Sequence, residues 1–208
     1  MNRNRLLIAT RNQGKVAEIV ALLDGLGYQV ESAADWNPLF PSPDETGTTF
    51  AGNALLKARY YHSLSGGLTL ADDSGLVVDA LGGAPGVHSA RYAGGGASSA
   101  ERVARLLREL EGVTAEHRTA RFVCAIAIVD SGLERVFEAQ CEGLITLEPS
   151  GSGGFGFDPI FFDRESGRTF AEMTMEEKAP RSHRGRALAA ARLFLSELIA
   201  SELIDGSR

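Results

Sequence analysis

The sequence predicts an α/β fold with a central mixed, twisted sheet, flanking helices and two lobes around a cleft. In the first half of the 208 residues, apolar runs typical of buried strands alternate with segments of helical spacing. Two β-rich runs then flank Ser131-Gly132, which predicts a hairpin. A segment rich in Ala and Leu closes the chain and predicts a long helix. This order favours a mixed sheet covered by helices.

The elements of the first half follow from apolar spacing and from Gly and Pro. Gly25 and Gly27 supply stop signals after a helical pattern, three prolines mark a loop, and Thr49 can cap a helix. We expect a strand at 5–10, a helix around 16–23, a strand at 28–32, a loop at 33–47, a helix after Thr49 and a strand at 68–71 that ends at Asp72-Asp73.

The second half carries equally local signals. Ser98 and Glu101 have the spacing of a capping box, in which each side chain satisfies a backbone N–H of the other residue. We expect a Gly-rich extended loop at 75–97, a helix after Ser98, hairpin strands at 121–129 and 134–146, a Gly-rich turn at 149–156 and a helix at 184–203.

Bulk composition indicates a globular chain, with 44% hydrophobic and 23% charged residues, and we expect one domain over 1–208. The net charge of −6 disfavours a nucleic-acid partner, so an anion would need a local group of cations. Cys124 and Cys141 have no metal-type spacing, which argues against a zinc site or disulfide scaffold. The chain has neither a signal-peptide pattern nor a membrane-length apolar run. We therefore expect a cytoplasmic location and no membrane partner.

The first candidate site joins the first strand to the first helix. A helix N-terminus at the carboxyl end of a strand offers free N–H groups to a phosphate. It is not a Walker A loop, because Ala9 and Val16 replace the required Gly and Ser/Thr. The alternative is a capped helix with a surface lysine. The residues concerned are Thr10, Arg11, Asn12, Gln13, Gly14 and Lys15.

Two acidic segments are candidates for a metal site. Asp72 and Asp73 adjoin a predicted strand end, where alternation should aim them to opposite sides. Mg2+ typically uses one or two carboxylates together with substrate phosphate. Asp44 or Glu45 could complete such a site from the loop. The alternatives are an acidic turn and a solvated acidic loop.

Asn53 and Lys57 are four residues apart in the helix expected after Thr49, so they share one of its faces. Lys57 is therefore a further cation to consider beside the acidic segments.

Two later segments could contact a flat or anionic ligand. Gly151–Asp158 matches G-x-G-x-x-G but is followed by Pro159 rather than by a helix, so it fails as a dinucleotide fingerprint. Its phenylalanines could stack on a base, or one could anchor a flexible turn. In the segment Glu177–Gly185, basic side chains and His183 gather before a long helix, where they would repel without an anion or acceptor.

Taken together, these segments resemble the inosine triphosphate pyrophosphatase family. The motifs occur in family order and cover nearly the whole chain. They are T-x-N-x-x-K at Thr10–Lys15, the (E/D)ETG-x-TF loop at Asp44–Phe50, NA-x-x-KA at Asn53–Ala58, ADDSGL at Ala71–Leu76, LGGAPGV-x-SARY at Leu81–Tyr92, GGFG(Y/F)DP at Gly153–Pro159 and EEK-x-x-x-SHR at Glu176–Arg184.

The resemblance implies hydrolysis of ITP, dITP and XTP to the monophosphate and pyrophosphate, a nucleotide cleft, a Mg2+ requirement and a homodimer. It implies that Asp73 is proton acceptor and metal ligand, that Asp44 is the second metal carboxylate, and that Thr10–Lys15 binds phosphates. We expect the charges of Lys15, Lys57 and Lys178 to offset that of the triphosphate. Nucleotide contacts are implied for Ser74, Phe155, Gly156, Phe157, Asp158, Lys178, His183 and Arg184.

Two departures from the family pattern bear on the site. Asp44 stands where many members have Glu, so Glu45 could hold the metal instead, and Phe157 replaces a frequent Tyr. Two alternatives to the expected function are a pyrophosphatase for pyrimidine or modified nucleotides and a non-catalytic nucleotide-binding module. The latter would not need acids at both 44 and 73.

Overall fold

The computed structural model describes residues 4–37 and 41–205, and its central element is a seven-stranded sheet. The strand order is β2-β1-β3-β4-β5-β6-β7. β1 pairs in parallel with β2 and β3, whereas β6 pairs antiparallel with β5 and β7, so the predicted mixed sheet is confirmed. The strands are β1 Arg5–Ile8, β2 Gln29–Ser32, β3 Thr69–Val78, β4 Thr119–Asp130, β5 Leu133–Ile145, β6 Phe161–Asp163 and β7 Arg168–Thr169.

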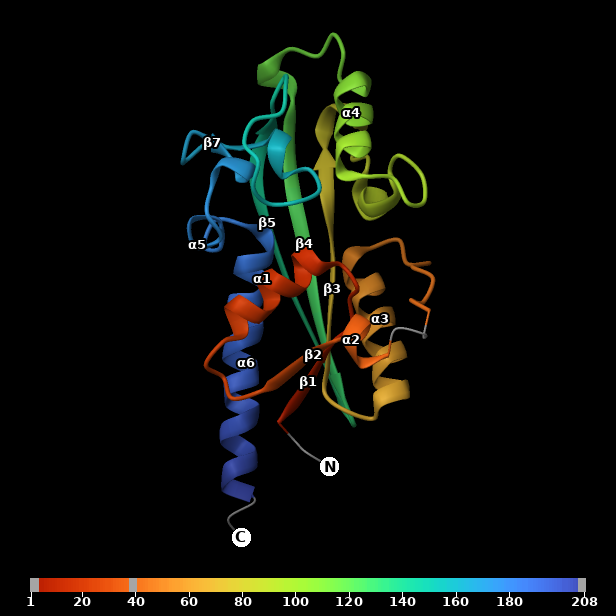
Figure 1. Cartoon of the computed structure of the whole chain (residues 1–208), viewed down its shortest axis with the longest axis vertical. Coiled ribbons are helices and arrows are strands. Elements are labelled where there is room, and N and C mark those ends of the chain that lie inside the picture. The colour runs from red at the N-terminus through yellow and green to blue at the C-terminus, as the bar shows by residue number, and fades with distance from the viewer. Residues whose placement is uncertain (1–3, 38–40, 206–208) are drawn as a thin grey trace. The chain divides into compact units, whose positions relative to one another are not determined.

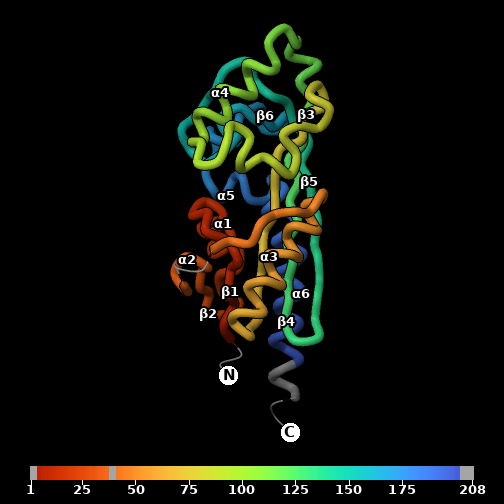
Figure 2. Tube along the Cα trace, turned by 90° about the vertical axis from the view of Figure 1, so that its right-hand side faces the viewer, coloured from red at the N-terminus to blue at the C-terminus, as the bar shows by residue number. Residues whose placement is uncertain are grey.

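Two helices begin where the sequence placed their caps. Thr49 accepts a backbone N–H of the first turn of α3, and Ser98 and Glu101 form the expected capping box. Asn12, which was not predicted as a cap, does the same for α1. β4 and β5 form the expected hairpin, visible as a long loop of chain in Figure 2. The helices are α1 Gln13–Leu23, α2 Ala33–Trp36, α3 Phe50–Ser65, α4 Ser99–Glu109, α5 Met175–Lys178 and α6 His183–Asp205.

The chain divides into two compact units, each built from separate stretches of sequence. The first unit comprises Met1–Asp73, Ala125–Glu138 and Gly185–Arg208, and the second comprises Ser74–Cys124 and Ala139–Arg184. Strands β3, β4 and β5 each contribute residues to both units. The single domain over 1–208 and the nucleotide cleft stay predictions.

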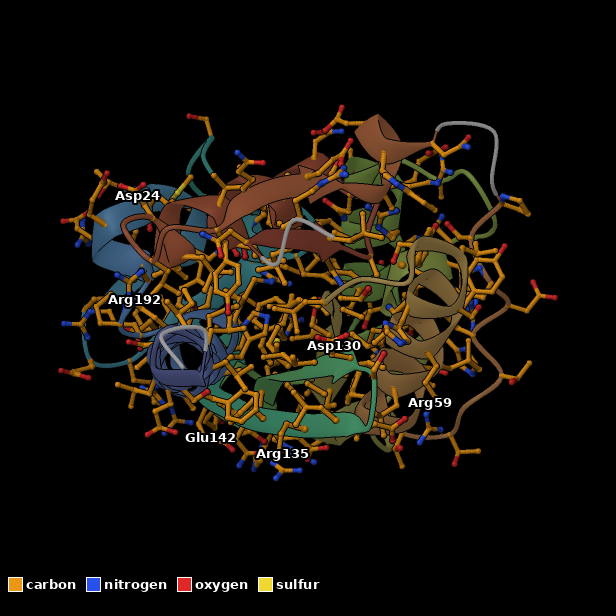
Figure 3. All side chains as sticks on the ribbon, turned by 90° about the horizontal axis from the view of Figure 1, so that it is seen from below. Asp24, Arg59, Asp130, Arg135, Glu142 and Arg192 are labelled. Carbon is orange, nitrogen blue, oxygen red and sulfur yellow. The ribbon has the colours of Figure 1, made fainter. Side chains whose placement is uncertain are left out.

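In the first unit, α3 covers one side of the strands while α1 and α6 cover the other (Figures 1 and 3). Ala54 and Ala58 of α3 pack on alanines of β3 and β4, and such small side chains let the helix backbone approach the sheet closely. On the other side, Arg192 of α6 donates to the carbonyls of Leu22 and Asp24 at 2.6 and 2.7 Å. These contacts satisfy carbonyls that the end of α1 leaves unpaired.

The second unit has its own aromatic core. Phe122 of β4 lies 4.6 Å from Phe161 and 6.0 Å from Phe170 between ring centroids. Val103 and Leu106 of α4 belong to the same buried cluster, so the helix predicted after Ser98 is present and packs an apolar face on this core.

Two predictions about the loops are wrong. β3 does not end at Asp72-Asp73 but continues to Val78, and the region expected to be an extended loop contains the rest of β3 and two 3-10 turns, Asp79–Leu81 and Gly86–Arg91. The predicted loop at 33–47 contains the short helix α2, and its residues 38–40 lie outside the described part. None of the described helices is long and apolar enough to cross a membrane.

Candidate active site

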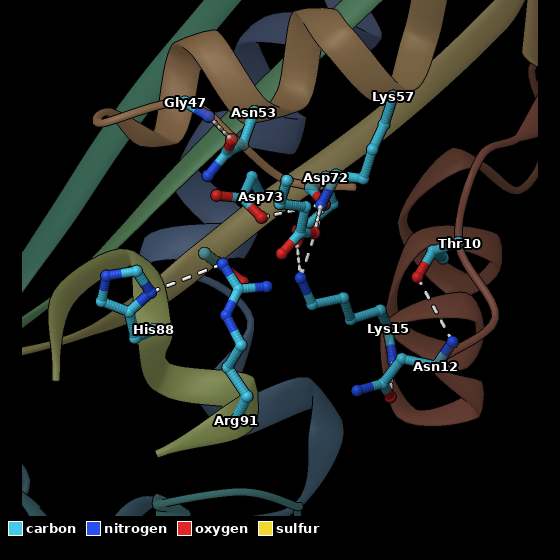
Figure 4. Close-up of polar contacts among 12 residues, drawn as sticks. Thr10, Asn12, Lys15, Gly47, Asn53, Lys57, Asp72, Asp73, His88 and Arg91 are labelled. Atoms are coloured by element: carbon cyan, nitrogen blue, oxygen red, sulfur yellow. Dashed lines mark hydrogen bonds and ion pairs between the residues drawn. The ribbon is translucent and has the colours of Figure 1, made fainter. Parts of the chain in front are cut away.

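The loop after β1 presents the start of α1 as predicted. Asn12 caps the helix by accepting the Lys15 N–H at 3.2 Å, and its own N–H donates to Thr10 Oγ1 at 3.3 Å (Figure 4). Gln13 and Gly14 form the first turn, in which backbone N–H groups lack helical partners. The guanidinium of Arg11 donates to the carbonyl of Asn37 at 3.0 Å.

Lys15 extends from α1 to the middle of β3. Its ammonium forms an ion pair with the carboxylate of Asp72, and Asp72 is fully buried. β1 pairs with β3 only as far as Leu70, so Asp72 lies just beyond the carboxyl end of β1. The ion pair of Lys15 and Asp72 therefore lies at the carboxyl end of β1, although β3 itself continues.

Asp73 pairs with a different lysine, which belongs to α3. Lys57 of α3 lies 2.7 Å from Asp73 Oδ1 and 2.8 Å from Glu45 Oε1, measured from Nζ. The two adjacent carboxylates therefore have their ion-pair partners on different helices, Lys15 on α1 and Lys57 on α3. That strand alternation aims them to opposite sides stays a prediction.

The electrostatics of this cluster favour a proton acceptor at Asp73. Burial raises the pKa of Asp73 and Glu45 adds to the effect, although Lys57 and Lys15 oppose it. Burial disfavours the charged form of Lys57, but Asp73 and Glu45 outweigh it, so the pKa of Lys57 is raised as well. A charged lysine therefore lies beside a carboxylate that binds its proton more tightly than an ordinary aspartate.

The structure distinguishes the two acidic residues of the loop. Glu45 reaches Lys57 and acts electrostatically on Asp73, whereas Asp44 is exposed. Glu45 is therefore linked to Asp73 through Lys57, and the metal role of Asp44 stays a prediction.

One oxygen of this cluster fits a cation. Asp73 Oδ2 is buried and has no hydrogen-bond partner among the described residues. Within the same residues, no group of three His, Cys, Asp or Glu side chains is arranged to hold a metal ion. A cation here would thus depend on one or two carboxylates and on oxygens supplied by a ligand, which is the usual manner of Mg2+ binding.

A second cluster lies in the second unit, around the ring of Phe155. The Lys178 ammonium is 5.2 Å and the Arg184 guanidinium 5.4 Å from the centre of this half-buried ring. Arg184 also donates to Ser74 Oγ at 2.7 Å. Both cations are donors without acceptor capacity. The cluster therefore combines an aromatic surface with side chains suited to a carbonyl oxygen.

Asp158 holds this cluster in place. Its Oδ2 lies 2.6 Å from Lys178 Nζ and accepts the Phe155 N–H at 2.9 Å. Gly154 has φ +66°, and a Cβ built on it would lie 2.1 Å from the same oxygen. Gly156 has φ +64° and donates its N–H to Ser99 Oγ at 3.2 Å. The glycine-rich loop is thus required for Asp158 to approach the backbone.

His183 is a buried member of the same unit. Its ring stacks on Phe122 with centroids 4.5 Å apart and an interplanar angle of 12°, and Cys141 Sγ lies 3.9 Å from Nδ1. The sequence placed His183 beside the arginines but gave no signal for Phe122, which is distant in the chain.

A single family model accounts for most of the chain. The model described as the Ham1 family matches residues 6–194. The chain belongs to the Ham1 family. The resemblance inferred from the motifs is therefore confirmed.

Ham1 relatives match in both sequence and structure. The dITP/XTP pyrophosphatase of Geobacter sulfurreducens is 53% identical over 186 residues, which are 89% of this chain and 93% of the relative. A HAM1 protein from Coxiella burnetii has a TM-score of 0.83 at 40% identity, with 93% of this chain and 98% of that chain covered. A nucleoside-triphosphatase/dITP/XTP pyrophosphatase from Mycobacterium abscessus has a TM-score of 0.72 at 45% identity, with 90% and 98% covered.

One detail of the predicted Ham1 site needs correction. Phe157 was expected to offer a stacking surface, but its side chain is 4% exposed and belongs to the core cluster with Tyr92. Stacking on a base, which stays a prediction, would therefore involve Phe155. Lys178 pairs with Asp158 in the second unit, and its expected action together with Lys15 and Lys57 stays a prediction.

Proposed function

We propose that this Ham1 protein hydrolyses non-standard purine nucleoside triphosphates, namely ITP, dITP and XTP, to the monophosphate and pyrophosphate. The observation that carries the proposal is Asp73, a buried carboxylate with a raised pKa, an unpaired oxygen and a lysine on its other oxygen. The names of the curated relatives supply the substrate class.

The first unit supplies the groups that the reaction at phosphorus needs. The N–H groups at the start of α1 and the ammonium of Lys15 bind the phosphates. Asp73 accepts the proton of the attacking water, which requires the carboxylate to be within hydrogen-bond reach of that water. Lys57 offsets the charge on the triphosphate as pyrophosphate leaves.

We assign the metal to Asp73, with Glu45 or Asp44 as the second carboxylate, and we propose Mg2+. The fit rests on the unpaired Asp73 Oδ2 and on the oxygen character of the available ligands. When bound, the ion supplies Lewis-acid polarisation of the phosphoryl oxygens.

The second unit supplies base selection. Lys178 and Arg184 can donate to the 6-keto oxygen of hypoxanthine or xanthine, while adenine would present an amino donor to these donors. A buried polar group left unpaired costs about 1–3 kcal/mol, which sets the scale of discrimination against ATP. Phe155 holds the ring by stacking.

The test is a panel of ITP, dITP, XTP, GTP, ATP and UTP, assayed with and without Mg2+ and with products identified. Release of pyrophosphate from the 6-keto non-standard purines in preference to ATP and UTP is expected. Preference for UTP would favour the pyrimidine alternative, and binding without turnover would favour a non-catalytic module. A homodimer and a cytoplasmic location stay predictions, the former to be checked by light scattering.

A further inference from the structure

Asn53 is a fully buried amide in the first turn of α3, close to Asp73. Its Oδ1 accepts the Gly47 N–H at 2.8 Å (Figure 4). Only the oxygen of an amide can accept this bond, so Gly47 fixes which end of the amide is which. The Nδ2 group is therefore the end directed away from Gly47.

The other end of this amide has no partner within residues 4–37 and 41–205. Asn53 Nδ2 and Asp73 Oδ2 are both buried side-chain atoms without a hydrogen-bond partner among the described residues. Leaving such a group unsatisfied costs about 1–3 kcal/mol, so buried polar atoms are nearly always paired with protein or with ordered water.

In Figure 4 the Asn53 amide and the free oxygen of Asp73 point toward one another, yet no direct hydrogen bond joins them. A donor that faces an acceptor without bonding it directly is a suitable site for a bridging water. Such a water accepts from Asn53 Nδ2 and donates to Asp73 Oδ2. One arrangement thus satisfies both atoms.

We propose that Asn53 and Asp73 together hold the attacking water of the hydrolysis, which makes Asn53 a further residue of the reaction and rests on the proposed function. The amide fixes the water oxygen, and one O–H is directed at Asp73 Oδ2. As the water oxygen bonds to the α-phosphorus, its proton passes to Asp73 and the bond to pyrophosphate breaks. A carboxylate oxygen has two acceptor positions, so the water leaves one for a cation.

A competing role for Asn53 is to hold the loop alone. Gly47 and Glu45 belong to the same loop, and the bond to Gly47 could serve only to position Glu45. The two roles use opposite ends of the amide, so substitutions can separate them. Asn53→Ala removes both ends, whereas Asn53→Asp keeps an acceptor for Gly47 and removes the donor.

The experiment measures ITP turnover by the wild type, Asn53→Ala and Asn53→Asp in the full chain, with Mg2+. We expect kcat to fall about 100-fold in both variants, the scale of a misplaced reacting group. We expect KM and the Kd of a non-hydrolysable α,β-imido analogue of ITP to stay unchanged, because the water and not the nucleotide loses its partner. Asn53→Asp with the kcat of the wild type would overturn the proposal.

Thr49→Ala is the matched control. Thr49 caps α3 by accepting the Gly52 N–H at 3.0 Å, so its loss weakens the start of the same helix by about 1 kcal/mol without touching the amide. A fall in kcat equal to that of Asn53→Ala would mean that helix stability explains the effect, and the proposal would be wrong.

A crystal structure of the nucleotide-free protein supplies a readout that is independent of turnover. We expect an ordered water within about 3.2 Å of both Asn53 Nδ2 and Asp73 Oδ2. A direct bond between the two side chains, or no water there, contradicts the proposal. A wild type that holds the water but does not hydrolyse any triphosphate contradicts the proposed function instead.

Discussion

Replacing Asp73 with Asn should separate catalysis from stability. The raised pKa of Asp73 means that the folded protein binds this proton more tightly than the unfolded chain does. The free energy of unfolding of the wild type therefore decreases as the pH rises from the ordinary pKa of an aspartate through the raised pKa of Asp73. Asn carries no charge at any pH, and Lys57 keeps Glu45 at 2.8 Å. The melting temperature at neutral pH should thus equal or exceed that of the wild type.

Turnover in the same variant should nearly disappear. Loss of a general base lowers rates about 10²–10⁴-fold. That range corresponds to about 3–5 kcal/mol of activation free energy at 1.36 kcal/mol per decade. The assay is pyrophosphate release from ITP with Mg2+, alongside thermal unfolding at neutral pH. Wild-type turnover in the folded variant would remove Asp73 from the mechanism. A melting temperature more than about 4 °C lower would refute the argument from its pKa.

Asp72→Asn is the control for this prediction, because it should affect stability more, and turnover less, than Asp73→Asn does. Asp72 is fully buried and its partner Lys15 is 14% exposed, so the change leaves a lysine without its carboxylate. Breaking a buried pair from one side costs about 3 kcal/mol at the low end. We expect lower stability and a milder loss of turnover than in Asp73→Asn. An equal loss of turnover would show that strand alternation does not separate the two roles.

Three further outcomes follow from the two clusters. Lys15→Ala should weaken binding of ITP more than of IMP in calorimetry, because its ammonium is proposed to bind phosphates that IMP lacks; an equal loss for both nucleotides would contradict that placement. Arg184→Ala should raise the KM for ITP and narrow the ITP-over-ATP preference about tenfold, or 1.4 kcal/mol; an equal loss for both nucleotides would assign Arg184 to phosphate or structure. Turnover should rise with pH through the raised pKa of Asp73, because its carboxylate must be deprotonated to accept a proton. The pKa of Lys57 is also raised, so this lysine stays charged over the same range. A rate that is independent of pH on the acid side would argue against Asp73 as the base.

The sequence predicted best where the signal is local. Helix starts follow from one capping side chain and its neighbouring N–H groups, so Thr49 and the pair Ser98 and Glu101 could be placed without knowledge of the fold. The β4–β5 hairpin likewise depends on residues close to Ser131-Gly132.

Predictions failed where distant partners decide. Gly75 and the two aspartates suggested that β3 stops, but pairing with neighbouring strands outweighs local propensity and carries β3 to Val78. Phe157 is buried by a core that includes Tyr92. A motif gives the identity of a side chain but not the partners that orient it.

Gly154 shows how a residue without a side chain can belong to the proposed recognition site. Its backbone occupies the left-handed region, and the space of its missing Cβ is taken by the oxygen that binds both Lys178 and the Phe155 N–H. A methyl group at this position would therefore overlap the carboxylate of Asp158, which binds both Lys178 and the backbone of Phe155. If this cluster selects the base as proposed, a substitution of Gly154 should change nucleotide preference and should not behave as a neutral change in a loop.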